Sequence, residues 1–122
     1  MVEDEPAVLD LIVTLLTETG WRVDVAAGGR TGLERVTSRN YDLIVSDMRM
    51  PEGGGDEFYR KAVAHNPKLA RRFLFITGDT ANPAAWKFLK DAKVAVLEKP
   101  FAATAFLEAV RVIALTVAPS PA

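Results

Sequence analysis

The sequence predicts an α/β fold in which helices cover both faces of a parallel sheet. Segments with apolar residues at helical spacing alternate along the chain with short extended segments, and the connections between them are short. Three extended segments are continuous apolar runs, as expected of strands buried on both faces: residues 43–45, 73–76 and 94–97. This alternation is typical of a doubly wound sheet, and we find neither an internal repeat nor a second domain.

The first third of the chain predicts two helices and one amphipathic strand. Apolar residues at helical spacing indicate a helix over residues 6–18, and Gly20 ends it. Residues 21–25 alternate between apolar and polar side chains, which is the pattern of a strand with one covered face. A second, shorter helix is expected over residues 29–38.

Each of the three buried runs leads into a further helix. These helices are expected over residues 56–65, 82–90 and 102–117. Residues 118–122 are rich in proline and alanine and are interpreted as a tail or linker. The sequence therefore predicts one domain over residues 1–117.

Composition excludes several classes of protein. The 122 residues include no cysteine and a single histidine, which excludes disulfides, thiolate zinc sites and histidine-rich metal sites. The formal net charge of -1 disfavours direct contact with nucleic acid. No apolar run is long enough to span a bilayer, so we expect a cytoplasmic domain without membrane contact.

Polar residues follow each buried run at the point where the strand is expected to end. These residues are Asp47, Thr77 and Lys99, and the acidic pair Glu3 and Asp4 directly precedes the first helix. Because the carboxyl ends of parallel strands share one edge of the sheet, these side chains should converge there. The predicted site thus contains three carboxylates, a hydroxyl and an ammonium group.

This set of groups is suited to phosphoryl chemistry. Clustered carboxylates repel one another and favour binding of a hard cation such as Mg²⁺. Asp47 could attack phosphorus and form an acyl phosphate, with Lys99 and the cation neutralising charge on the phosphoryl oxygens.

Four motifs in this order resemble the receiver domain of two-component response regulators. They are VEDEP at residues 2–6, DMRMP at 47–51, TG at 77–78 and KPF at 99–101. The stretches ITGDTANP and LEKPF are most similar to receivers attached to hybrid sensor histidine kinases. The resemblance implies a flavodoxin-like (CheY-like) fold with a doubly wound parallel sheet in the order 2-1-3-4-5.

The resemblance also implies a role for each site residue. Asp47 matches the phosphoacceptor, Thr77 the hydroxyl that turns toward the phosphoryl group, and Lys99 the lysine that pairs with it. The implied Mg²⁺ ligands are the side chains of Asp4 and Asp47, the backbone carbonyl of Arg49 and, through water, Glu3. The phosphoryl group would come from a phosphohistidine on a sensor histidine kinase or phosphotransfer protein. An attached kinase or output domain would be possible, with a response around the last two helices.

The sequence departs from the family pattern at its start and at one position shortly before Lys99. Receivers begin with an apolar first strand, whereas only Met1 and Val2 precede Glu3 here. We expect a truncated first strand, either because the natural protein continues upstream or because rearrangement or another chain fills the gap. Val96 stands where receivers often carry tyrosine or phenylalanine, so signal transmission through backbone shifts is expected.

Two further departures concern the surroundings of Asp47. Glycines at residues 53–55 should make the loop after Asp47 mobile. Arg49 and Asp79, each two residues beyond a site residue, should overhang the phosphoryl pocket. We hypothesise that they form an ion pair that changes the lifetime of the phosphorylated state.

Two other functions remain open at this point. A Mg²⁺-dependent phosphohydrolase that works through an aspartyl phosphate would usually carry a second aspartate where Arg49 stands. A degenerate receiver that only binds a partner would not need the full set of site residues. The glycine-rich stretch at residues 28–32 is interpreted as a turn, and His65 as an exposed residue at the end of a helix. Trp86 either packs in the core or contacts a partner.

Overall fold

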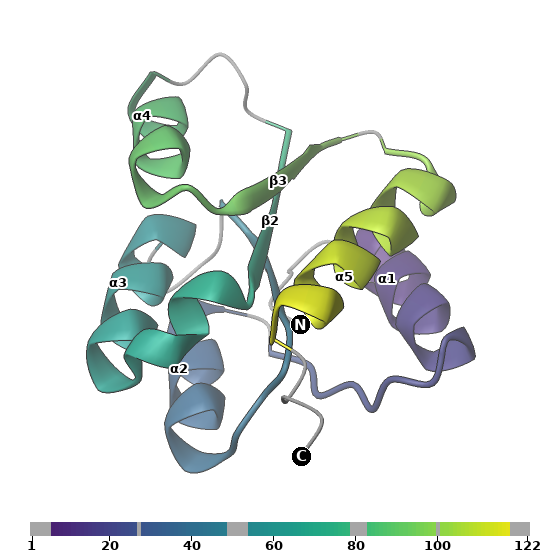
Figure 1. Ribbon diagram of the computed structural model, residues 1–122, viewed down its shortest axis with the longest axis horizontal. Helices are drawn as coiled ribbons and strands as arrows, with labels where there is room; N and C mark the ends of the chain where they lie inside the picture. Colours follow the sequence, from purple (N-terminus) through teal and green to yellow (C-terminus); the bar gives the residue numbers. More distant parts are fainter. Residues whose placement is uncertain (1–5, 27, 49–53, 79–82, 100, 118–122) are drawn as a thin grey trace.

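Three parallel strands form a sheet at the centre of the molecule, with helices on both sides of it (Figure 1). The computed structural model describes residues 6–26, 28–48, 54–78, 83–99 and 101–117. The strands are β1 (Ile44–Asp47), β2 (Phe73–Thr77) and β3 (Ala95–Glu98), and their order in the sheet is β1-β2-β3. Ile44 pairs with Phe73 and Leu74 pairs with Ala95, which sets the three strand ends side by side.

The helices divide into two groups around this sheet. Their bounds are α1 (Pro6–Glu18), α2 (Gly29–Ser38), α3 (Gly55–His65), α4 (Pro83–Ala92) and α5 (Ala103–Val117), with a short 3-10 helix, η1 (Pro67–Arg71), before β2. In Figure 1, α1 and α5 lie together on one side of the strands, and α2, α3 and α4 lie on the other. The molecule is therefore a three-layer α/β/α arrangement of the flavodoxin-like kind predicted from the sequence.

The sequence of β2 is a continuous apolar run because both faces of this strand are covered. Phe73 and Phe75 pack into the core beneath α2, α3 and α4, whereas Leu74 and Ile76 pack into the core beneath α1 and α5. Successive side chains of a strand point to opposite faces, so a strand covered on both faces needs an apolar residue at every position. All five residues of β2 are buried, including the four of the predicted apolar run at residues 73–76.

Each face of the sheet has its own hydrophobic core. The core shared with α1 and α5 contains Ile12, Leu16, Val45, Leu74, Ile76, Phe106, Val110 and Ile113. The core shared with α2, α3 and α4 contains Ala26, Val36, Ile44, Met48, Phe58, Ala62, Leu69, Phe73, Phe75 and Leu89. Because the two cores anchor the sheet from both sides, the ends of the strands are fixed relative to one another.

Most of the predicted elements are confirmed, with small shifts at their ends. The predicted helices at 6–18 and 29–38 match α1 and α2, and the predicted strand at 73–76 is one residue longer in β2. The prediction for residues 94–97 is wrong in one respect, because β3 is only half-buried rather than buried on both faces. In the described part of the sheet β3 is an edge strand, so it has a neighbouring strand on one side only and its residues are less buried than those of β2.

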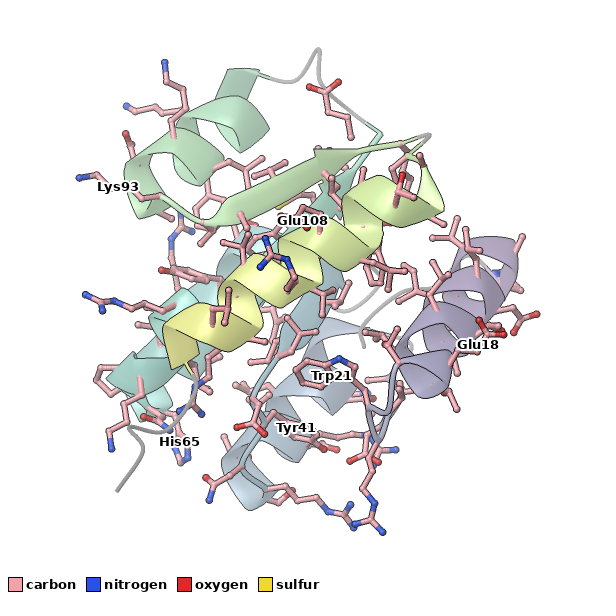
Figure 2. The ribbon with its side chains drawn as sticks, turned by 45° about the vertical axis from the view of Figure 1, so that its right-hand side comes forward. Glu18, Trp21, Tyr41, His65, Lys93 and Glu108 are labelled. Carbon is pink, nitrogen blue, oxygen red and sulfur yellow. The ribbon has the colours of Figure 1, made fainter. Side chains whose placement is uncertain are left out.

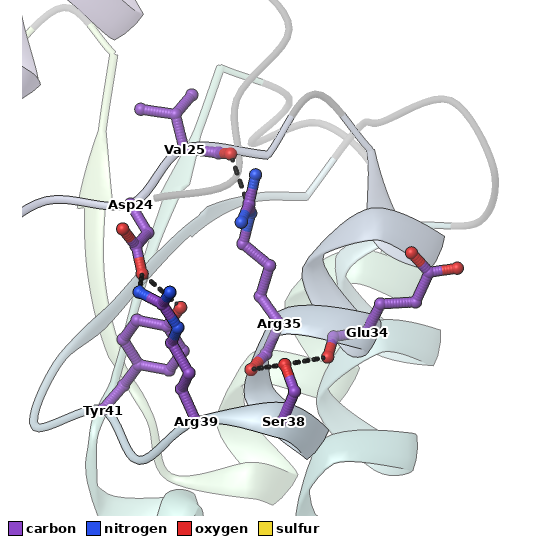
Figure 3. A network of polar contacts seen from close by, with 7 residues as sticks. All are labelled: Asp24, Val25, Glu34, Arg35, Ser38, Arg39 and Tyr41. Atoms are coloured by element: carbon purple, nitrogen blue, oxygen red, sulfur yellow. Dashed lines mark hydrogen bonds and ion pairs between the residues drawn. The ribbon is translucent and has the colours of Figure 1, made fainter.

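The strand predicted at residues 21–25 is not formed. This segment is extended but belongs to no ladder, with a single bridge at Ala26. The predicted alternation of buried and exposed side chains is confirmed in part, since Trp21 and Val23 pack against the core beneath α1 and α5. A strand needs backbone hydrogen bonds to a neighbour, and the carbonyl of Val25 instead accepts a bond of 3.1 Å from Arg35 Nε (Figure 3).

The predicted order 2-1-3-4-5 is therefore seen only in its last three positions, which correspond to β1, β2 and β3. Residues 1–5, on which the predicted truncation of the first strand falls, lie outside the described residues.

Gly20, predicted to end the first helix, does so with a φ of 95°, a left-handed conformation that glycine adopts without steric cost.

Side-chain contacts hold the extended segment to the rest of the domain. Tyr41 Oη donates a hydrogen bond of 2.6 Å to Asp24 Oδ2, and Arg39 forms an ion pair of 3.3 Å with the same oxygen (Figure 3). The hydrogen bond from Tyr41 lowers the pKa of Asp24, helped by the guanidinium of Arg39 and opposed by partial burial. Burial, followed by this bond to Asp24, raises the pKa of Tyr41.

Candidate phosphoacceptor site

Three of the predicted site residues come together at the carboxyl edge of the sheet. Asp47 is the last residue of β1, Thr77 is the last residue of β2, and Lys99 follows directly after β3. The ladder places Asp47 beside Ile76 and Thr77 beside Glu98, so these strand ends are adjacent in space. The structure thus brings these three strand ends together at one edge of the sheet, and it brings the side chains of Asp47 and Lys99 into contact.

Lys99 and Asp47 form an ion pair across the edge. Lys99 Nζ lies 2.8 Å from Asp47 Oδ2, and the exposed fractions of the two side chains are 19% and 8%. Water screens an ion pair little at this level of burial, so the attraction is stronger than that of an exposed pair. The ammonium of Lys99 is therefore held against the carboxylate of Asp47.

Thr77 fixes the backbone of the lysine as well as contributing a hydroxyl. The N–H of Lys99 donates a hydrogen bond of 2.8 Å to the carbonyl of Thr77. Thr77 is only 2% exposed, and the next residue, Gly78, lies beside the aliphatic stem of Lys99. The backbone of Lys99 is thus anchored to the end of β2, and its ammonium reaches Asp47 from there.

The backbone of Asp47 is held from both neighbouring residues. Ser46 is fully buried, and its Oγ–H donates a hydrogen bond of 2.9 Å to the carbonyl of Asp47. The N–H of Met48 donates a longer bond of 3.3 Å to the carbonyl of Ile76 on β2. These contacts restrict the position of the carboxylate before any ligand binds.

Gly55 is a contact of the site that was not predicted from the sequence. A Cβ atom on Gly55 would lie 2.6 Å from the carbonyl oxygen of Asp47 and 3.0 Å from Phe75 Cε1. The N–H of Gly55 donates a bond of 2.9 Å to the carbonyl of Met48. The glycine was expected to loosen the loop, whereas its lack of a side chain allows α3 to begin against the back of Asp47. The one sign of this close approach in the sequence is that Gly55 is the last of three consecutive glycines and directly precedes the predicted helix at residues 56–65.

The other predicted members of the site lie outside the described residues. These are Glu3, Asp4, Arg49 and Asp79. Among the residues that are described, no group of three or more potential metal-ligating side chains is present. Asp47 offers carboxylate oxygens at the sheet edge, which are the ligand type that Mg²⁺ prefers, and it is the one implied Mg²⁺ ligand among the described residues.

The interpretation of His65 agrees with the structure, whereas the interpretation of residues 28–32 as a turn is wrong, because residues 29–32 form the first turn of α2. His65 is exposed at the end of α3, and Gly28 is the N-cap of α2 without a side-chain cap bond. The side chain of Trp86 lies outside the described residues. A cavity of about 660 Å³ lies away from Asp47, between residues 19–24 and 39–43. Trp21 and Tyr41, which line it, are labelled in Figure 2.

The family of the chain is decided by its sequence as a whole. A family model for the response regulator receiver domain matches residues 1–111. This chain belongs to the response regulator receiver domain family. The receiver domain is 34% identical over 104 residues to the response regulator receiver protein CpdR of Brucella abortus, covering 83% of this chain and 82% of CpdR.

Other relatives are longer proteins. The receiver domain is 31% identical over 113 residues to the transcriptional regulatory protein CutR of Streptomyces coelicolor, which covers 93% of this chain and 51% of CutR. It is 35% identical over 103 residues to the sensor kinase CckA of Brucella abortus, covering 83% of this chain and 11% of CckA. The chain therefore spans about half the length of CutR and a small part of CckA.

Solved structures agree with this assignment. A CheY-like receiver domain from Methanospirillum hungatei superposes with a TM-score of 0.81 at 27% identity, covering 90% of this chain and 86% of the other. The beryllofluoride-activated receiver domain dimer of NtrC4 also has a TM-score of 0.81, at 28% identity and with 96% and 95% coverage. In the described part of the receiver domain, no helix has the length and apolar character needed to cross a membrane.

Proposed function

We propose that the receiver domain accepts a phosphoryl group onto Asp47 from a phosphohistidine and later loses it to water. A carboxylate oxygen of Asp47 forms a bond to phosphorus as the phosphorus–nitrogen bond of the donor breaks, and the electron pair returns to the imidazole nitrogen. Water then attacks the acyl phosphate, which releases inorganic phosphate and restores the carboxylate. The single observation that carries this proposal is the 2.8 Å ion pair between Lys99 and the buried carboxylate of Asp47.

Lys99, Thr77 and the proposed Mg²⁺ ligands each have a role in this reaction. Lys99 donates hydrogen bonds to phosphoryl oxygens when its contact with Asp47 is exchanged for them, and it balances their added charge. Thr77 directs its hydroxyl to the same group from the end of β2. A bound Mg²⁺, held by Asp47 with Glu3, Asp4 and the carbonyl of Arg49, would supply charge neutralisation on the phosphoryl oxygens.

We also propose the class of partner. The phosphoryl donor is a sensor histidine kinase or a phosphotransfer protein, and the receiver domain acts in the cytoplasm without direct contact with nucleic acid. The similarity to part of the sensor kinase CckA supports attachment to a hybrid histidine kinase. The similarity to CutR, a transcriptional regulatory protein, supports an attached output domain as the alternative.

Arg49 and Asp79 are proposed to set the lifetime of the phosphorylated state. Each stands two residues beyond a site residue, Asp47 or Thr77, and an ion pair between them would restrict the approach of water to the acyl phosphate. Exchanging either residue for alanine should change the rate of autodephosphorylation, measured by loss of the phosphoryl mass after the donor is removed. Unchanged rates in both variants would contradict this role.

Intact-mass spectrometry after incubation with Mg²⁺ and acetyl phosphate tests the proposed function. The protein should gain the mass of one phosphoryl group, and Asp47→Asn should gain none. Asp91→Asn, an exposed aspartate on α4, is the matched control and should be phosphorylated like the natural protein. EDTA should prevent the gain.

Other outcomes would favour other functions. Continuous turnover of phosphate esters that depends on Asp47 would indicate a phosphohydrolase. Absence of any adduct in a folded protein would indicate a module that only binds a partner, and the proposed phosphoacceptor function would be wrong.

A further inference from the structure

The contact of Gly55 with Asp47 links the site to helix α3. The backbone of Gly55 lies so close to the carbonyl of Asp47 that no Cβ atom fits between them. The same missing Cβ would also lie 3.0 Å from the ring of Phe75. The first residue of α3 is therefore packed between the backbone of the candidate phosphoacceptor and an aromatic ring of the central strand.

Phe75 in turn contacts one ring from α3 and one from α4. Its ring centroid lies 6.1 Å from that of Tyr59 on α3 and 5.7 Å from that of Phe88 on α4. Tyr59 and Phe88 are themselves 5.5 Å apart in an edge-to-face arrangement. These three rings, which we call the aromatic triad, connect β2 to both helices on one side of the sheet.

We propose that the Gly55 contact and the aromatic triad transmit changes at Asp47 to the face formed by α3 and α4. This inference rests on the proposed phosphorylation of Asp47. A phosphoryl group on Asp47 changes the charge and the contacts at the end of β1, and the backbone there cannot move toward α3 without displacing Gly55. Closely packed interiors have little free space to absorb such a movement, so it passes to Phe75, Tyr59 and Phe88.

Val96 supplies no aromatic ring to this part of the sheet, which makes the ring of Phe75 important for the proposed route. Val96 stands where related domains often carry an aromatic residue, and it lies beside Phe75 in the ladder between β3 and β2. The valine is half-buried against the same core as the aromatic triad. The large ring in this part of the sheet is thus supplied by β2 and is directed toward α3 and α4.

Fluorine NMR of protein labelled with 3-fluorotyrosine provides a direct test, because the chain has two tyrosines. Tyr59 belongs to the aromatic triad, whereas Tyr41 precedes β1 at the opposite end of that strand from Asp47 and is bonded to Asp24. Addition of Mg²⁺ and beryllofluoride, a phosphoryl mimic, should shift the Tyr59 signal and leave the Tyr41 signal in place. The fluorides of bound beryllofluoride give their own signals, so occupancy of the site is measured in the same spectrum.

Two variants test the route itself. Phe75→Leu should bind beryllofluoride while losing the Tyr59 shift, because the central ring of the triad is gone. Phe88→Leu, which changes a half-buried ring, should reduce the shift and serves as the deciding variant if Phe75→Leu does not fold by circular dichroism. Phe106→Leu, in the core on the other side of the sheet, is the matched control and should keep the full shift.

The outcomes separate this inference from the proposed function. Bound beryllofluoride without a Tyr59 shift, or an undiminished shift in both triad variants, would overturn the inference and leave phosphorylation of Asp47 intact. A shift of equal size at Tyr41 would also overturn it, since the response would then not be confined to the α3–α4 face. No bound beryllofluoride in folded protein would contradict the proposed function itself.

Discussion

Lys99 Nζ lies 2.8 Å from Asp47 Oδ2, although the two residues are 52 positions apart in the chain. The pair forms because two parallel strands, β1 and β3, end at the same edge with one strand between them. Neither residue can move far, since Asp47 is the last residue of a buried strand and the backbone of Lys99 is bonded to Thr77. The fold therefore places a cation on the candidate phosphoacceptor before any substrate arrives.

Replacing this lysine should cost both stability and reactivity. Lys99→Met is expected to lower the free energy of unfolding by about 1 to 3 kcal/mol, because the poorly hydrated carboxylate of Asp47 loses its cation. Phosphorylation by acetyl phosphate should slow as well. Urea denaturation measures the first effect and the rate of phosphoryl mass gain the second.

A double-mutant cycle isolates the contribution of the pair. In the Asp47→Asn background, Lys99→Met should cost less stability than in the natural protein, with a coupling energy of about 0.5 to 3 kcal/mol. Lys90→Met, an exposed lysine on α4, controls for loss of a positive charge and should change stability little. Equal costs of Lys99→Met in both backgrounds would show that the pair adds nothing to folding.

Two glycines near the site should respond differently to alanine. Gly55→Ala places a Cβ 2.6 Å from the carbonyl oxygen of Asp47, so the backbone must shift, at an expected cost of about 1 to 3 kcal/mol. At Gly78 the nearest atoms to such a Cβ are 3.8 Å away on Lys99, which is ordinary contact. Gly78→Ala should therefore change the urea midpoint little. Similar midpoints for the two variants would contradict the close approach at Gly55.

The site could be predicted from the sequence because it depends on where strands end. A buried strand is marked by a continuous apolar run, and the first polar residues after it mark its carboxyl end. Parallel topology then requires Asp47, Thr77 and Lys99 to meet, whatever the exact bounds of each strand. Small errors in those bounds, such as the late start of β1 at Ile44, do not affect this conclusion.

What could not be predicted depends on contacts between distant segments. Residues 21–25 have a strand pattern, yet their backbone is held by Arg35 and their side chains by Tyr41 and Arg39 rather than by a ladder. The same limit applies to Gly55. A glycine in a loop sequence indicates freedom, and only the position of Asp47 and Phe75 shows that it is needed for a close approach.

The hydroxyl of Thr77 should matter more for reaction than for folding. Thr77→Val keeps the buried shape but removes the hydroxyl, and a lost hydrogen bond to a charged group, worth about 1.5 to 3 kcal/mol, corresponds to slowing of phosphorylation on the order of tenfold or more. Thr77→Ser keeps the hydroxyl and should retain most of the rate. Equal rates for the valine and serine variants, measured by phosphoryl mass gain, would exclude a role for the hydroxyl.

The bond between Tyr41 and Asp24 predicts a dependence of stability on pH. The pKa of Asp24 is lowered in the folded protein from its ordinary value of 3.8, chiefly by the hydrogen bond from Tyr41. A carboxyl group with a lowered pKa adds stability above its unfolded pKa, and this stability is lost as the pH falls through the folded pKa. Tyr41→Phe should therefore lower the urea midpoint at neutral pH, and the difference from the natural protein should shrink below the ordinary pKa of an aspartate.

Tyr59→Phe is the matched control for this prediction. Burial raises the pKa of Tyr59 above its ordinary value of 10.0, and no carboxylate is among the causes of that shift. Its phenol stays protonated throughout the acid range, so any stability difference between Tyr59→Phe and the natural protein should be the same at neutral and acidic pH. A difference for Tyr41→Phe that is equally constant would mean that the Asp24 bond does not help to hold the segment at residues 21–25 in its folded position.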